Sequence, residues 1–140
     1  MDRRNLIRLV GFGSVAGIIA PDVVLASSQS MAGGLYYTKD APGRWSKKAT
    51  GHLPQVAVSK NDVGTAIQVI TPHEVKGYEH YIVKHMLLDQ EFNFIAEKMF
   101  DPATEKSALS NFELDKSYAG SINVLSVCNK HDTWLNVVEV

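Results

Sequence analysis

From residue 53 to the C-terminus, short runs of alternating apolar and polar residues are separated by pieces rich in Asp, Asn, Lys, Pro and Gly. A two-residue period is typical of β-strands with one buried face, and the 3.6-residue period of an amphipathic helix is scarcely present. The pattern predicts seven strands, at residues 53–59, 64–71, 80–89, 91–100, 107–115, 119–129 and 133–140. Strands of this number and spacing indicate an all-β fold, a seven-stranded immunoglobulin-like antiparallel β-sandwich.

The N-terminal stretch has a different pattern. Arg3 and Arg4 precede an apolar run at residues 9–20, and residues 24–26 are the small or apolar residues that a signal peptidase reads. The run is shorter than the roughly 20 apolar residues of a membrane-spanning helix, so cleavage is favoured over anchoring. We therefore expect residues 1–26 to be a twin-arginine-type signal peptide and the mature protein to be periplasmic and free of the membrane. Because that route exports folded proteins, often with a cofactor already inserted, the signal favours a metalloprotein.

Composition and charge fit one globular domain after the signal. The chain has 140 residues, of which 45% are hydrophobic and 21% charged. Residues 27–50 contain glycines and a proline and predict an extended arm or loop, which leaves residues 51–140 as the β-sandwich domain. A net charge of −1 without a basic cluster interleaved with aromatics excludes nucleic acid as the expected partner. The last run, residues 133–140, either completes the sandwich or pairs with a second subunit in a homo-oligomer.

Candidate chemistry begins with the one cysteine of the chain. Cys128 cannot form an intramolecular disulfide, so it is either a buried apolar filler or a thiol kept for its chemistry. A histidine, His131, follows three residues later between two predicted strands. Alternation within residues 80–89 puts His80 and Ile82 on one face of that strand and His85 on the other. We therefore interpret His85 as a surface histidine or a hydrogen-bonded core residue.

The remaining histidines form a candidate set of metal ligands with the cysteine. Four of them lie at strand edges or in loops beside turn residues, namely His52, His73, His80 and His131. Imidazole nitrogen and thiolate sulfur are ligands of iron, copper and zinc, and the loops of β-sandwiches often supply a cysteine and a histidine at short spacing. The pattern predicts a metal site and leaves the metal open.

Three stretches carry a resemblance to a known family. In order and spacing, "GHLPQV", "PHEVKGYEHYIVKHMLL" and "VCNKHDTWLN" resemble the motifs of superoxide reductases of the desulfoferrodoxin and neelaredoxin type. Those motifs are Glu-Lys-His-Val-Pro, then His-Pro running into His-Tyr-Ile, then Cys-Asn-x-His-Gly-x-Trp. The resemblance covers roughly residues 51–134. The family fold is a seven-stranded immunoglobulin-like sandwich, which agrees with the strand count reached from periodicity.

The resemblance implies a cofactor and a reaction. It implies one mononuclear non-haem iron per chain, with Cys128 as axial ligand and four equatorial nitrogens from His52, His73, His80 and His131. The implied reaction is reduction of superoxide to hydrogen peroxide, with an external electron donor that returns the iron to its ferrous state.

The sequence also departs from the family pattern. Thr50 stands where the family has the glutamate that is the sixth ligand of the resting ferric state, and Gly51 stands where it has a lysine in the catalytic pocket. Because superoxide is an anion, lysines close in sequence to the ligands are candidates to attract it. They are Lys47, Lys48 and Lys76, and we predict the last two as catalytic residues.

The residues leave two other functions open. A blue-copper electron carrier also uses a β-sandwich with a cysteine and a histidine in a C-terminal loop, but its copper needs two histidines, and usually a methionine soon after the cysteine. No methionine follows Cys128. A β-sandwich binding module with a vestigial metal site is favoured by the missing glutamate and lysine. Tyr81 and Trp134 are interpreted as core residues in each case.

Overall fold

The computed structural model describes residues 31–140, and residues 32–140 form one compact unit. The signal peptide predicted at residues 1–26 lies outside the described residues. Among the residues that are described, no helix is long and apolar enough to cross a bilayer.

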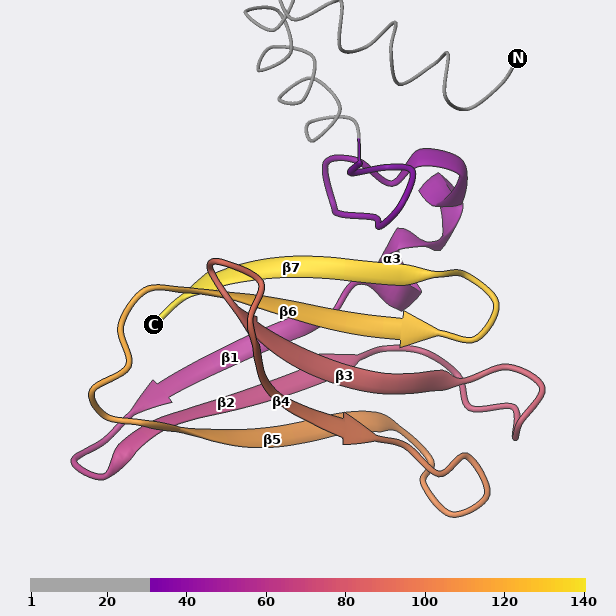
Figure 1. Ribbon diagram of the computed structural model, residues 1–140. Helices are drawn as coiled ribbons and strands as arrows, with labels where there is room; N and C mark the ends of the chain where they lie inside the picture. Colours follow the sequence, from indigo (N-terminus) through magenta and orange to yellow (C-terminus); the bar gives the residue numbers. More distant parts are fainter. Residues whose placement is uncertain (1–30) are drawn as a thin grey trace, which may run out of the picture. The chain divides into compact units, whose positions relative to one another are not determined.

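Seven strands form two antiparallel sheets (Figure 1). In chain order they are β1 Gln55–Lys60, β2 Gly64–Thr71, β3 Ile82–Asp89, β4 Phe94–Met99, β5 Ala108–Asp115, β6 Ser121–Cys128 and β7 Thr133–Glu139. One sheet has the order β1-β2-β5 and the other β4-β3-β6-β7, with every neighbouring pair antiparallel. The predicted antiparallel β-sandwich is confirmed, and all seven predicted strands are present.

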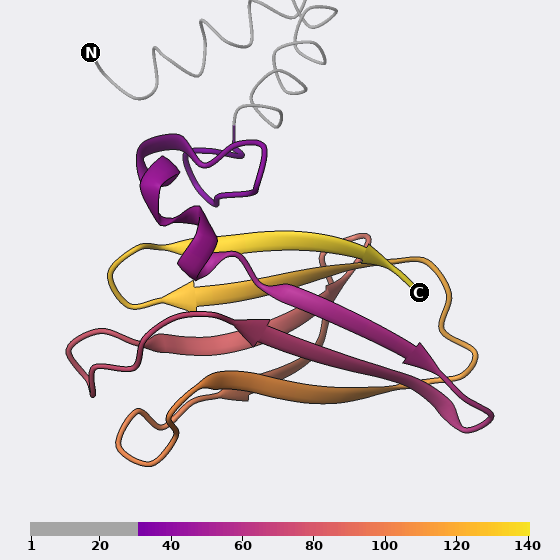
Figure 2. The same ribbon diagram turned by 180° about the vertical axis from the view of Figure 1, so that it is seen from behind.

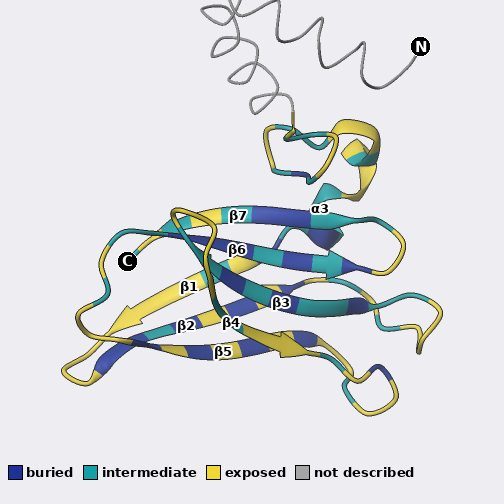
Figure 3. Cartoon of the chain, in the orientation of Figure 1, coloured by how far each residue is buried: buried dark blue, intermediate teal, exposed yellow. Residues whose placement is uncertain are grey.

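The core lies between the two sheets. Burial alternates residue by residue along β5 and from Thr65 to Thr71 of β2 (Figure 3). In β3 the buried residues are Ile82, His85 and Leu87. The main cluster contains Ile67, Val69, Leu87, Phe112, Leu114, Ile122 and Val124. Burying each such side chain contributes about 1.5–3 kcal/mol, so this cluster is the main source of the stability of the sandwich.

A β-bulge at the start of β3 corrects one prediction. The register against β6 shifts between Ile82 and Lys84, and the extra residue resets the alternation. As a result Ile82 and His85 are both buried, and the prediction that they lie on opposite faces is wrong. His80 precedes the strand and forms an isolated bridge with Lys76. His85 is a fully buried, hydrogen-bonded core residue, one of the two roles expected for it.

The segment before β1 is not simply extended. It contains a short 3-10 helix, η2 Gly43–Lys48, followed by one turn of α-helix, α3 Ala49–His52. Earlier in the segment Tyr37 bridges β7: its N–H donates to the carbonyl of Thr133 at 2.9 Å, and its carbonyl accepts from the N–H of Leu135 at 2.8 Å. Helical turns this short show no helical periodicity in the sequence, so the sequence predicts only an extended arm or loop here.

Three segments meet at one end of the sandwich. They are α3, the loop of residues 72–81 between β2 and β3, and the turn of residues 129–132 between β6 and β7. The C-terminus lies at the other end, as both views of the ribbon show (Figures 1 and 2). Because connections at one end of a sandwich come from strands far apart in sequence, distant residues can assemble there.

Candidate metal centre

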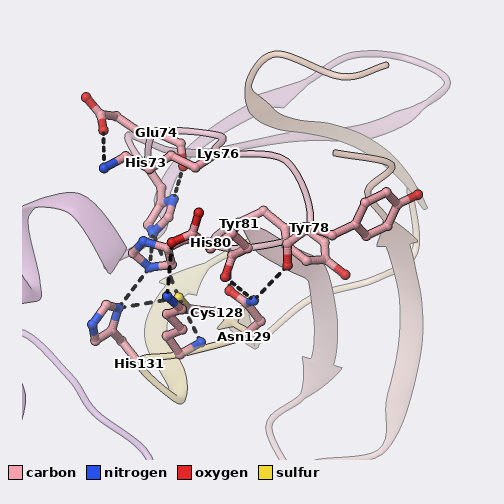
Figure 4. A network of polar contacts seen from close by, with 11 residues as sticks. His73, Glu74, Lys76, Tyr78, His80, Tyr81, Cys128, Asn129 and His131 are labelled. Atoms are coloured by element: carbon pink, nitrogen blue, oxygen red, sulfur yellow. Dashed lines mark hydrogen bonds and ion pairs between the residues drawn. The ribbon is translucent and has the colours of Figure 1, made fainter. Parts of the chain in front are cut away.

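The five predicted ligands come together at that end of the sandwich. Each offers one donor atom, and these atoms all lie within 4.8 Å of one another. Helix α3 supplies His52. The 72–81 loop supplies His73 and His80, the end of β6 supplies Cys128, and the following turn supplies His131 (Figure 4). No aspartate or glutamate belongs to the cluster among the described residues.

Short distances join the donor atoms in a chain around the cluster. His131 Nδ1 lies 3.1 Å from His52 Nε2 and 3.0 Å from His80 Nε2. His80 Nε2 in turn lies 3.0 Å from His73 Nε2. The sulfur of Cys128 is 3.6 Å from His131 Nδ1 and 3.8 Å from His73 Nε2.

Backbone carbonyls fix the tautomer of two of the rings. His52 Nδ1 lies 2.8 Å from the carbonyl oxygen of Lys48, and His73 Nδ1 contacts the carbonyl oxygen of Glu74. A carbonyl only accepts, so each Nδ1 carries the proton. In a neutral ring the opposite nitrogen then has a free lone pair, and both Nε2 atoms direct theirs into the cluster.

Neutral rings alone cannot satisfy the three inward nitrogen contacts. His52 and His73 cannot donate inward, so His131 and His80 would each have to donate to them. The contact between His80 and His131 would then join two N–H groups, and any other choice of tautomers leaves a contact between two lone pairs. A cation among four lone pairs removes every such conflict. Four imidazoles and a thiolate are nitrogen and sulfur ligands suited to iron, copper or zinc, so the residues present fit the implied iron.

The protonation state of the cluster also suits a metal. Burial is the largest cause that lowers the pKa of all four histidines. For His52 and His80 the charges of the neighbouring rings act in the same direction, and together these causes lower the pKa of each to about 4. The pKa values of His73 and His131 are shifted in the same direction. Imidazole binds metals in its neutral form, so the ligands are ready at neutral pH.

The surroundings of the cysteine and of His131 restrain both ligands. Cys128 is buried, and its sulfur lies 3.4 Å from the backbone N–H of Lys130, which donates to it. Trp134 is fully buried, as a core residue should be, and its indole N–H also donates to the carbonyl of His131 at 2.9 Å. A core residue therefore holds one of the ligands.

Asn129 joins the two loops that carry ligands (Figure 4). Its side-chain oxygen accepts from the N–H of Tyr81 at 3.0 Å, and its amide donates to the carbonyl of Glu79 at 3.0 Å. These contacts lie on either side of His80. Reasoning from the sequence missed this role, although Asn129 stands inside the Cys128–His131 motif.

Asp132 makes a second connection, between the β6–β7 turn and η2. Its carboxylate accepts from the indole N–H of Trp45 at 2.8 Å and pairs with Arg44 at 2.6 Å, and these two contacts lower its pKa. The ring of Trp45 packs edge-on against His131, with 4.7 Å between centroids. Trp45 and Asp132 were not among the predicted site residues, since their pairing spans most of the chain.

The predicted lysines differ in their surroundings. After burial, the charge of Lys48 is the largest influence that lowers the pKa of His131. Lys76 also lies near the cluster, but it pairs with Glu74 at 3.6 Å. Thr50, at the position of the family's glutamate, lines a surface hollow beside Leu53.

Comparisons with solved structures identify the fold. The superoxide reductase (neelaredoxin) from Ignicoccus hospitalis has a TM-score of 0.63 and 24% identity, covering 77% of this chain and 95% of that one. A variant of it gives a TM-score of 0.67 at 23% identity, covering 77% and 94%. A reduced variant of the neelaredoxin from Archaeoglobus fulgidus gives 0.56 at 19%, covering 66% and 92%. No family model and no curated protein matches the sequence. At these identities the chain shares the fold of superoxide reductases.

Proposed function

We propose that the protein is a superoxide reductase that converts superoxide to hydrogen peroxide at a mononuclear iron, one per chain. The observation that carries the proposal is the convergence of four imidazole nitrogens and the Cys128 sulfur within 4.8 Å, in a cluster to which no carboxylate of residues 31–140 belongs. The shared fold and the predicted twin-arginine signal support it, and the signal would place the reaction in the periplasm.

The residues of the chain have separate tasks in this reaction. When bound, the iron supplies one electron, which with two protons converts superoxide to hydrogen peroxide, and an external donor then restores the ferrous state. Cys128 would hold the iron through its thiolate, whose negative charge would supply electron density to the ion. The carbonyls of Lys48 and Glu74 orient two rings and fix their tautomers, whereas burial keeps these rings neutral.

Lys48 is the better of the two predicted catalytic lysines. Superoxide is an anion, and a nearby ammonium raises its rate of encounter with the site, most strongly at low ionic strength. The charge of Lys76 is partly neutralised by Glu74, whereas no ion pair of Lys48 occurs among the described residues. We therefore assign the attraction of superoxide mainly to Lys48.

The test of the lysines compares three substitutions. We expect Lys48→Met to lower the second-order rate constant with superoxide about 3- to 10-fold at low salt, and Lys76→Met to lower it less. Lys60→Met, on β1, removes an exposed charge from a strand that carries no ligand and is the control. Equal rates for Lys48→Met and Lys60→Met would show that Lys48 has no such role.

The test of the function itself starts from metal content. The folded mature protein should contain about one iron per chain, and its oxidised form should show a thiolate-to-iron absorption band that Cys128→Ser abolishes. The reduced protein mixed with superoxide should form one hydrogen peroxide per iron oxidised. Copper would favour the electron carrier, even though four histidines exceed the two that it needs, and absence of any metal would favour the binding module.

A further inference from the structure

A chain of buried polar side chains crosses the sandwich next to the metal centre. His85 Nε2 lies 2.8 Å from Thr71 Oγ1, and Thr71 Oγ1 lies 2.8 Å from Ser126 Oγ. On the other side of the ring, His85 Nδ1 lies 2.7 Å from Ser110 Oγ. All four side chains are at most 2% exposed. The four residues come from four strands and so hydrogen-bond the two sheets to each other.

These polar groups stand out because the interior between the sheets is otherwise largely apolar. Four buried polar side chains add no stability over apolar residues of the same shape unless every one is hydrogen-bonded. No buried side-chain polar atom among the described residues lacks a partner. A complete network of hydrogen bonds fixes the relative positions of the strands to which its residues belong. Apolar contacts are not directional and fix these positions less precisely.

Two of the strands in the network lead to metal ligands at their ends. Thr71 is the last residue of β2, and its carbonyl accepts a hydrogen bond from the N–H of His73 at 2.7 Å. Ser126 lies two residues before Cys128, which ends β6. The Thr71–Ser126 hydrogen bond thus connects the strand end that leads into His73 with the strand end that carries Cys128.

We propose that Thr71, His85 and Ser126 are positioning residues of the metal centre, which set the separation of the His73 nitrogen from the Cys128 sulfur. That separation, 3.8 Å, spans the two sheets and therefore depends on how the sheets are joined. His85 orients the Thr71 hydroxyl and keeps it within hydrogen-bond distance of Ser126. The inference rests on the metal centre of the proposed function and not on the reaction.

The experiment measures iron binding by the whole mature chain. The affinity for Fe²⁺ alone is determined anaerobically by competition with a chelator, together with the position of the thiolate-to-iron band after oxidation. Thr71→Val keeps the shape of the side chain and removes the hydroxyl. Because Thr71 acts on the ligands through the strand ends and not by a direct hydrogen bond, it should lower the affinity about 10-fold, the lower end of the loss that follows removal of a direct hydrogen bond to a metal ligand, and shift the band. Thr71→Ser restores the hydroxyl and should bind within about twofold of the wild type.

Leu87→Ala is the matched control for a general loss of stability. Leu87 is buried on the same face of β3, two residues beyond His85, and belongs to the apolar cluster. It should lower the thermal midpoint of unfolding while leaving the iron affinity of the folded protein unchanged. If Thr71→Val does not fold, Ser126→Ala removes the same hydrogen bond by deleting one oxygen atom, and it should lower the affinity equally.

The outcomes separate the two proposals. Wild-type affinity and an unshifted band in Thr71→Val or Ser126→Ala overturn the positioning role, as does an equal loss of affinity in Leu87→Ala. A wild-type protein that binds iron but does not react with superoxide overturns the proposed function and leaves the positioning role intact. A wild-type protein that binds no iron overturns both.

Discussion

At the scale of single residues, the hydrogen bond made by the outward ring nitrogen of His52 or His73 determines that the inward nitrogen is the unprotonated one, which is able to bind a metal. The partners of His52 and His73 are backbone carbonyls, so substitutions of the Lys48 or Glu74 side chains leave these hydrogen bonds in place. The members of the cluster could be predicted from the sequence because histidine and cysteine beside turn residues are distinctive. Their carbonyl partners could not, because every residue has a carbonyl and only the fold chooses one.

His85 gives a residue-scale prediction on pH. Burial lowers its pKa to about 4 from an ordinary 6.5. Between these values the unfolded chain binds more protons than the folded one, so the free energy of unfolding falls as the pH is lowered. For this one residue the loss between about pH 7.5 and about pH 5 is on the order of 2 kcal/mol.

Denaturant unfolding of the metal-free protein checks this. His85→Leu should be less stable than the wild type at about pH 7.5, and the difference should shrink by about 2 kcal/mol at about pH 5. His52 and His80 also have lowered pKa values, but they are present in both proteins and cancel in the difference. A gap that stays constant with pH would mean that His85 is not held neutral in the folded chain.

At the scale of elements, the periodicity of the sequence predicted the seven strands but not the irregular parts of the fold. The bounds of β2, Gly64–Thr71, were predicted without error, and burial alternates in this strand from Thr65 to Thr71. The bulge in β3 and the turns of η2 and α3 were missed, since each breaks or lacks a repeat. Local irregularity of this kind is decided by contacts across the fold, and here those contacts involve the metal ligands.

The loop of residues 72–81 gives an element-scale prediction. Asn129→Ala removes the hydrogen bonds to Tyr81 and Glu79, which should cost about 1–3 kcal/mol and allow the backbone beside His80 to exchange its amide hydrogens faster. Hydrogen exchange of residues 76–81 and the affinity for Fe²⁺ are the measurements. We expect faster exchange in this loop and weaker binding of the metal.

A second asparagine provides the control. Asn123 donates to the carbonyl of Asp89, away from the ligands, so Asn123→Ala should destabilise the protein without changing the iron affinity or the exchange of the 72–81 loop. Indistinguishable effects of the two substitutions on the loop would refute a specific role for Asn129.

At the scale of the whole molecule, the metal centre and the apolar core stabilise different parts. The core cluster lies between the sheets, and the ligands join α3 and two loops at one end. We therefore expect the metal-free protein to remain a folded β-sandwich and iron to add stability by mass action, about 2.7 kcal/mol at 100 times the dissociation constant. Residues 133–139 complete the sandwich as β7 beside β6, which is one of the two roles expected for this stretch, and homo-oligomer formation stays a prediction.

Thermal unfolding with and without iron checks the separation. The wild type should unfold at a higher temperature with iron than without it, and Cys128→Ser should lose most of this increase while keeping the midpoint of the metal-free protein within a few degrees. A metal-free wild type that has lost its β-structure would show that the core is insufficient without the ligands.

The position of the C-terminus has a practical consequence. Val140 follows β7 at the end of the sandwich away from α3 and the ligand loops (Figure 1). A tether attached there would fix the protein to an electrode or a bead with the ligand-bearing end facing the solution. Immobilised protein could then be reduced and exposed to successive oxidants without a soluble electron donor, so the turnover of each variant could be measured on one surface.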